Sequence, residues 1–311
     1  MKFPIESLNH SVSKSLSRFD VVYKAVLDKG LHNEIILTEK INGHNVFSEI
    51  DENGQVYISP SFCQFIWNIS YAALIITDTT SIMKELNKVG INKDMFLNML
   101  SGYEENPEIG FIISELNAMP WDNVLVTGYY CLKKHITQAV VDNLKMQDMT
   151  SIFSQKVNGI YQAGITFVLL HELYHWERGH FWNTMTRIDK EKEADDYAFR
   201  TILLNNFTDN EMKTYIVGSI CVLFSFFFNN PSLHKDERYP YEDDRLFAQF
   251  DKLKSPEMEN CRSLIIQILK EWAKFFNIDN FPQLTGVDMN DLYNIRKFLE
   301  CYKKKCNSQY K

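Results

Sequence analysis

The sequence predicts a mainly helical α+β protein, in which a small strand-containing N-terminal part is followed by a larger helical part. Short runs of alternating apolar and polar residues are confined to residues 35–60 of the 311-residue chain. Beyond them, apolar residues recur at three- and four-residue spacings, which is the period of an amphipathic helix. The chain shows no internal repeat and no low-complexity block, so a globular core is expected.

Three segments of the N-terminal part are predicted to be strands, at 35–41, 44–50 and 55–59. The sequence Asp51-Glu52-Asn53-Gly54 between the last two is typical of a β-hairpin with a longer loop. From Ser61 to about Leu86 the pattern is helical, and glycines and prolines make residues 90–125 a loop-rich connection. Further helices are expected at 129–147, 152–178, 189–205, 209–228, 241–253, 257–276 and 288–303.

This change of pattern places a boundary near residue 125. Residues 1–125 would form an α/β N-terminal portion, and residues 126–311 a helical portion that carries the strongest functional motif. A chain of 311 residues is long enough for one large domain or two smaller ones, and the sequence leaves both open.

Composition and charge indicate a globular protein that does not bind nucleic acid. Hydrophobic residues make up 45% of the chain and aromatic residues 14%, which favours a packed interior. The net charge of −7 argues against phosphate binding, which needs a basic face. The run Lys303-Lys304-Lys305 near the C-terminus is expected to be a solvated tail.

Cysteine usage and hydropathy predict a cytoplasmic protein without a membrane span. The six cysteines are scattered and form no Cys-x-x-Cys pair, so neither a disulfide framework nor a thiolate zinc cluster is expected. The N-terminal residues lack the apolar stretch of a secretory signal. The longest apolar run, 216–228, is interrupted by Gly218 and is shorter than the roughly 20 residues of a membrane span. We therefore expect it to be a buried core helix.

The strongest functional signal is His171-Glu172-Leu173-Tyr174-His175, an HExxH motif. Residues four apart on a helix share a face, so His171 and His175 can offer imidazole nitrogens to one zinc ion. Glu172 then lies beside the open coordination position, where it can serve as the general base and acid of hydrolysis. With eight histidines in the chain the motif can also arise by chance, so neighbouring residues must support it.

A third ligand is expected from the acidic segment 191–198. Glu191 and Asp195 lie four apart and share a helix face, so Glu191 would complete a His2Glu zinc site. Asp195 would then accept a hydrogen bond from the outer nitrogen of a ligand histidine and fix its tautomer. Glu193, on another side of the helix, is the second choice for the ligand. A solvated, charged helix start is the alternative explanation of this segment.

His180 is a competing third ligand. One class of zinc protease has a glycine three residues, and a third histidine six residues, after the second histidine of HExxH. Here Arg178 and Phe181 occupy those positions, and Gly179 and His180 each lie one residue away. We therefore interpret Gly179 as a helix terminator and His180 as a residue at the surface or behind a ligand.

Residues 234–245 are a second candidate region for catalysis. Arg245, His234, Tyr239 or Tyr241 could donate a hydrogen bond to the oxyanion of a tetrahedral intermediate. Tyr239 and Arg245 are our candidate catalytic residues here. The competing explanation is an ordinary loop before an acidic helix start, because no spacing rule ties this region to the metal.

Together these residues resemble the gluzincin metallopeptidases, which pair HExxH with a downstream ExxxD. The matching positions are His171, Glu172, His175, Glu191 and Asp195. The segment that begins at Glu191 is also similar to the ExEAxxxA helix of several intracellular members. In many of those a later His-Pro…Arg segment completes the site; here Tyr239-Pro240 and Arg245 stand in its place, and the histidine is replaced.

Within that group, the length, the mid-chain motif and the strand-bearing N-terminal part resemble the Lit-type phage-exclusion peptidases. Those are prophage-borne bacterial enzymes that cleave elongation factor Tu when a phage peptide is present. The resemblance implies a zincin-like helical region and an endopeptidase that acts on a folded cytosolic protein, such as a translation factor. It also implies a role in antiviral defence by abortive infection.

The leading hypothesis is therefore zinc-dependent hydrolysis of a peptide bond in a cytosolic protein. An activating partner is expected besides the protein or peptide substrate, because uncontrolled cleavage would be toxic. One alternative is a regulatory or binding protein that keeps the fold with a structural zinc or none, against which the intact Glu172 argues. Another is a helical interaction protein with a chance HExxH, against which the five matching positions argue. The sequence predicts no oligomeric state.

Overall fold

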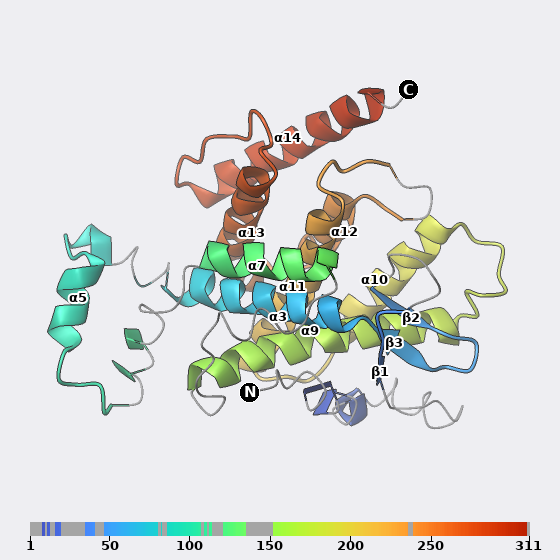
Figure 1. The fold of residues 1–311 in the computed structure, drawn as a ribbon, viewed down its shortest axis with the longest axis horizontal. Coiled ribbons are helices and arrows are strands. Elements are labelled where there is room, and N and C mark those ends of the chain that lie inside the picture. The colour runs from blue at the N-terminus through green and yellow to red at the C-terminus, as the bar shows by residue number, and fades with distance from the viewer. Residues whose placement is uncertain are drawn as a thin grey trace.

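In the computed structural model the chain is mainly helical, with a small three-stranded sheet in its N-terminal part (Figure 1). This confirms the predicted α+β, mainly helical fold class. The structure describes residues 8, 9, 11, 12, 16–19, 35–40, 47–79, 82, 86–106, 109, 110, 112, 113, 121–134, 152–235 and 239–309.

The sheet contains three short strands in the order β1-β3-β2. β1 (Ile35–Leu37) runs parallel to β3 (Val56–Ile58), and β2 (Ser48–Ile50) runs antiparallel to β3. The predicted hairpin turn closes because the Asp51 carboxylate accepts hydrogen bonds from two turn amides, while Gly54 adopts a φ of +81°. The three strands are confirmed in shortened form, and residues 41 and 44–46 of the predictions lie outside the described residues.

α3 (Pro60–Leu74) follows the sheet directly. Ser59 caps it by accepting a hydrogen bond from the amide of Phe62, and the helix continues into a π-helical turn (Ile75–Thr79). Among the described residues before the sheet, Leu16–Arg18 form a 3-10 turn. The helical pattern predicted from Ser61 is thus confirmed as far as residue 79, and most of 80–85 lies outside the described residues.

The structure contradicts the loop-rich connection expected at 90–125. α5 (Lys93–Leu100) forms within it, because the Asn92 side chain caps the amide of Met95 and starts a helix. α7 (Trp121–Lys134) begins before the predicted start at residue 129. The continuation predicted for 135–147 lies outside the described residues.

The remaining predicted helices are confirmed, with ends that differ by a few residues. Polar caps explain two of the starts: Thr186 and Thr208 each accept a hydrogen bond from an amide three residues further on. The helices are α9 (Ile152–Glu177), α10 (Arg187–Leu203), α11 (Asp209–Asn229), α12 (Glu242–Phe250), α13 (Ser255–Phe275) and α14 (Asp288–Gln309).

α9 is the central element of the packing. It contacts α3, α10 and α11, and β2 lies against it as well (Figure 1). α9 and α11 approach closely at Gly164 and Gly218, where a Cβ on Gly218 would lie 2.6 Å from the amide nitrogen of Gly164. One cluster of buried apolar side chains includes residues on both sides of the predicted boundary at 125/126. The division into two portions stays a prediction.

α11 contains the apolar run that the sequence indicates as a core helix. It is long and apolar enough to cross a membrane, yet 67% of its most apolar window is buried inside the protein. Packing against α9 therefore accounts for its composition.

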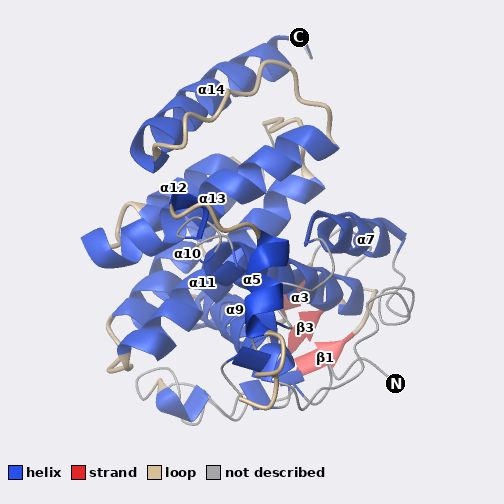
Figure 2. Ribbon diagram, turned by 90° about the vertical axis from the view of Figure 1, so that its left-hand side faces the viewer, coloured by secondary structure: helices blue, strands red, loops and turns tan. Residues whose placement is uncertain are grey.

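The C-terminal helix α14 lies at the opposite end of the molecule from the sheet (Figure 2). The solvated tail predicted for Lys303–Lys305 is wrong for Lys303, which is 7% exposed. Lys303 lies one helical turn after the buried Leu299, so it shares the inner face of α14. Its ammonium group pairs there with Asp243 at 2.7 Å and Asp244 at 2.9 Å, which joins α14 to α12.

Candidate active site

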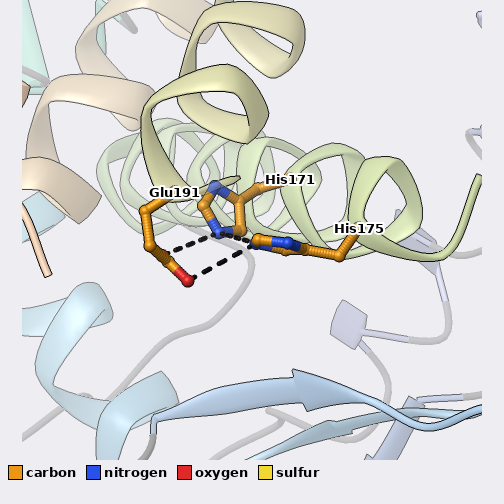
Figure 3. A group of neighbouring side chains, drawn as sticks. All are labelled: His171, His175 and Glu191. Atoms are coloured by element: carbon orange, nitrogen blue, oxygen red, sulfur yellow. Dashed lines mark hydrogen bonds and ion pairs between the residues drawn. The ribbon is translucent and has the colours of Figure 1, made fainter. Parts of the chain in front are cut away.

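The HExxH residues lie on α9. The polar side chains of the first two, His171 and Glu172, are enclosed there by apolar neighbours. Leu169, Leu170 and Leu173 are buried around His171 and Glu172, which are themselves 7% and 6% exposed. His171 and His175 project from the same face of the helix (Figure 3). Their Nε2 atoms are 3.0 Å apart, so both point toward one position.

Glu191 reaches this position from α10. Its Oε2 lies 3.4 Å from Nε2 of His171, and its Oε1 lies 3.6 Å from Nε2 of His175 (Figure 3). The cap at Thr186 fixes where α10 starts, and this start turns Glu191 toward α9. Glu193, the second choice from the sequence, has a 47% exposed side chain and lies outside the group.

The three side chains fit a metal ion. One ligand atom from each of His171, His175 and Glu191 lies within 4.8 Å of the others. Two imidazole nitrogens and a carboxylate are the donor set of a catalytic zinc site, which keeps its fourth position for water or substrate. Asp243, Asp244 and Glu300 also cluster, but Lys303 already supplies a cation to all three.

Asp195 supports His171 from behind, as the spacing predicts. Its Oδ1 lies 3.0 Å from Nδ1 of His171, so the imidazole is oriented with Nε2 toward Glu191. Asp195 is 1% exposed, and it is balanced by Arg245 of α12, whose Nε and Nη2 donate to both of its oxygens.

Ion pairing outweighs burial at these groups. Burial raises the pKa of Glu191, but hydrogen bonding and charge from His171 lower it to about 2. Burial likewise raises the pKa of Asp195, and Arg245 holds it well below its usual range. Burial lowers the pKa of His171, yet Asp195 and Glu191 raise it to about 10. Both carboxylates are therefore ionised at neutral pH.

Glu172 faces the N-terminal sheet. The hydroxyl of Ser48 on β2 donates to its Oε1 at 2.6 Å. Burial raises the pKa of Glu172 above its ordinary value, while His171 and the Ser48 hydrogen bond lower it. Sequence reasoning missed Ser48, because no motif in its own segment indicates a role at the active site. Only the contact of β2 with α9 brings Ser48 next to Glu172.

A cleft of about 1530 Å³ opens beside the group. β2 and the turn after it form one wall, and the start of α10 forms another. Phe62, Phe167 and Phe226 add an apolar lining next to the metal-binding side chains. The cleft is large enough to receive an extended peptide.

Of the four residues of segment 234–245 that were predicted as candidates for catalysis, three line the cleft and one points away from it. Tyr239 and His234 line the cleft, and the hydroxyl of Tyr239 accepts a hydrogen bond from Arg187 at 2.6 Å. Arg245 also lines it, although its Nε and Nη2 already serve Asp195. Tyr241 points to α14, where its hydroxyl accepts from Asn307. The catalytic roles of Tyr239 and Arg245 stay predictions.

His180, the competing ligand from the sequence, lies behind His175 and outside the group of three. Its Nδ1 is 2.8 Å from Nδ1 of His175, the ring nitrogen that faces away from Glu191. The signal that could have found this contact is Gly179, which ends α9 with a φ of +61°.

A largely buried His2Glu group beside a carboxyl and a cleft defines the site of a metallopeptidase. Comparison with protein families agrees, since the model of the family Peptidase U49 matches residues 56–265, more than half of the chain. The chain belongs to the Peptidase U49 family, the Lit peptidase family, and is a peptidase. Comparisons with curated proteins and with solved structures gave no match.

Proposed function

We propose that this peptidase is a zinc-dependent endopeptidase that cleaves a protein substrate in the cytoplasm. The observation that carries the proposal is the convergence of His171, His175 and Glu191 beside Glu172. Two imidazole nitrogens and one carboxylate match zinc better than magnesium or calcium, which prefer oxygen ligands. Zinc binding would displace the proton that His171 holds between Asp195 and Glu191. A zinc ion held by these residues would supply Lewis acidity for hydrolysis of a peptide bond.

Glu172 is the proton carrier in this proposal. Its carboxylate is buried next to His171 and lines the cleft, so a water molecule there is within its reach. Glu172 takes a proton from the attacking water and delivers it to the leaving amine. Ser48 keeps one carboxylate oxygen engaged, which leaves the other oxygen for the water.

The remaining cleft residues would position the substrate. Tyr239 and Arg187 are held together by a hydrogen bond and by the contact of the guanidinium with the ring, 4.8 Å from its centroid. Both line the cleft, where a phenol or guanidinium group can donate to a carbonyl oxygen of the bound peptide. Tyr239 is our candidate for the oxyanion, with Arg245 as a donor whose Nη1 is not used by Asp195.

The finer proposal is phage exclusion, with a translation factor as the substrate and an activating partner that controls cleavage. Membership of the Lit peptidase family supports it. The alternative is a regulatory protein in which the metal is structural. Glu172 argues against this alternative, because a structural site has no use for a buried carboxyl beside an open position.

The first experiment measures metal content and hydrolysis together. Wild type, Glu191→Gln, Glu193→Gln and Glu172→Gln are purified, loaded with zinc and analysed by plasma emission spectrometry. Each is then incubated with denatured casein and with purified elongation factor Tu. We expect about one zinc per chain in wild type, Glu193→Gln and Glu172→Gln, and loss of zinc in Glu191→Gln.

The hydrolysis measurement distinguishes the proposed enzyme from the alternative, a regulatory protein with a structural metal. Glu172→Gln should keep the zinc and lose cleavage of both substrates, with Glu193→Gln as the matched control that keeps both properties. Wild type without zinc, or cleavage by Glu172→Gln at the wild-type rate, would contradict the proposal. Full activity on elongation factor Tu without any added partner would refute the activating partner alone.

A further inference from the structure

The end of α9 brings His180 against a metal-binding histidine. α9 ends at Glu177, and Gly179 then takes a left-handed φ of +61°. The amide of Gly179 donates to the carbonyl of Trp176, and the amide of His180 donates to the carbonyl of His175. This pair of bonds is a Schellman motif, which folds the residue after the glycine back onto the last turn of the helix.

Packing holds the His180 ring in this position. The side chain is buried, and its ring lies 4.9 Å from the ring of His175 and 5.6 Å from that of Tyr174. Tyr174 is itself stacked on Tyr197 of α10 at 4.4 Å. Lys190 donates to the carbonyl oxygen of His180, which anchors the loop to α10. Residues of α9, of α10 and of the loop between them therefore hold the two histidines in contact.

The Nδ1 atoms of His175 and His180 are 2.8 Å apart, which is a hydrogen-bond distance. Such a bond between two imidazoles needs one proton, so one ring donates and the other accepts. A metal-binding His175 must keep the Nε2 lone pair for the metal, which puts its proton on Nδ1. His175 is then the donor and His180 the acceptor, and His180 carries its own proton on Nε2, 3.6 Å from the carboxylate of Glu193.

We propose that His180 is a positioning residue that fixes the tautomer and ring orientation of His175 for metal binding. The proposal rests on the proposed zinc site. It gives the two metal-binding histidines different supports: His171 is backed by a charged carboxylate, Asp195, and His175 by a neutral imidazole. The outer nitrogen of each ligand thus has a polar atom close to it, Oδ1 of Asp195 at 3.0 Å or Nδ1 of His180 at 2.8 Å, as is usual for histidines that bind a metal.

The test compares His180→Leu with His180→Asn. Leucine fills a similar space without an acceptor, whereas the Oδ1 of asparagine is attached at the same position along the side chain as Nδ1 of histidine. Zinc affinity is measured by competition with a chromophoric chelator on the purified chain. We expect His180→Leu to bind zinc 10–100-fold more weakly than wild type, and His180→Asn to recover most of that loss.

Two controls separate positioning from other roles. Trp182→Ala, in the same loop and 74% exposed, should leave zinc affinity unchanged. The stoichiometry at saturating zinc should stay at the wild-type value in His180→Leu, because His180 is not itself a ligand. Nitrogen-15 spectra of the zinc-loaded wild type should place the proton of His180 on Nε2 and that of His175 on Nδ1.

The experiment distinguishes failure of this inference about His180 from failure of the proposed zinc peptidase function. Wild type that binds no zinc overturns the proposed function together with this inference. Wild-type zinc binding with undiminished affinity in a folded His180→Leu variant overturns this inference alone. A His180 proton on Nδ1 in the zinc-loaded protein does the same.

Discussion

Arg245 on α12 binds both carboxylate oxygens of Asp195 on α10, with Nε at 2.7 Å and Nη2 at 2.8 Å. The guanidinium group also lies 4.2 Å above the ring of Phe226, and both ionic partners are buried. Asp195 in turn contacts His171, a metal-binding histidine. The position of α12, which holds Arg245 against Asp195, therefore helps to fix the orientation of the His171 ring. Arg245 is thus structural as well as a candidate catalytic residue.

The first prediction concerns this buried pair. Arg245→Met leaves Asp195 as an uncompensated buried charge, so the free energy of unfolding should fall by about 3–5 kcal/mol. Urea denaturation measures the change. Arg200→Ala is the control, because it breaks an exposed pair with Asp196 and should cost only about 0.2–1 kcal/mol. Equal losses in the two variants would contradict the role assigned to Arg245.

The second prediction concerns Ser48 and the pH profile. The Ser48 hydroxyl stabilises the ionised form of Glu172, so Ser48→Ala should raise the pKa of that carboxyl. A general base acts when ionised, and the acid limb of log kcat/KM against pH should therefore move to higher pH. Ser48→Thr keeps a hydroxyl and should restore the wild-type limb. An unmoved limb in Ser48→Ala would exclude this coupling.

The third prediction compares two helical glycines. A Cβ on Gly218 would lie 2.6 Å from the carbonyl oxygen of Ile160 in α9, a backbone atom that cannot move aside. Gly218→Ala should therefore destabilise the protein by about 1–3 kcal/mol or more. Among the described residues, a Cβ on Gly159 would meet only a methyl group of Thr214, at 3.9 Å, so Gly159→Ala should stabilise the protein by about 0.5–1 kcal/mol. Thermal and urea unfolding measure the change in stability of each variant. A change of the same sign in both variants would contradict the close approach of α9 and α11.

The fourth prediction concerns acid stability. A hydrogen bond from Arg18, with further bonds from Thr208, lowers the pKa of Glu211 to about 2. The folded-state pKa lies below the unfolded value of about 4.3, so this carboxylate stabilises the protein above about pH 4.3. The contribution is lost as pH falls toward about 2.

Glu211→Gln tests this assignment. The variant should melt below wild type at pH 6 to 7, roughly neutral conditions under which Glu211 is ionised in both states. The difference in melting temperature should shrink as the pH is lowered through about 4. A difference that is constant with pH would show that the capping geometry alone, and not the charge, stabilises α11.

Local patterns predicted most of the helices and the core of the site. Four-residue spacing was enough to place His171 beside His175 and Glu191 beside Asp195, because a helix fixes which residues share a face. In the structure the caps Thr186 and Thr208 begin α10 two residues before its predicted start and α11 at its predicted start. The pattern failed for α5, whose Asn92 cap lies among turn-like residues, and for Lys303, whose inner position depends on α12.

The sequence by itself determined the helical character of the chain and the HExxH pair. It favoured Glu191 over Glu193 as the third ligand but left the choice open, and the packing of α10 against α9 places Glu191 beside the two histidines. Only the tertiary structure decided what surrounds them. Ser48 and Arg245 come from segments far from α9 in the chain, and the folding of β2 and α12 brings them to Glu172 and Asp195. The physical reason is that periodicity fixes directions within one helix, whereas contacts between elements depend on how their buried faces pack.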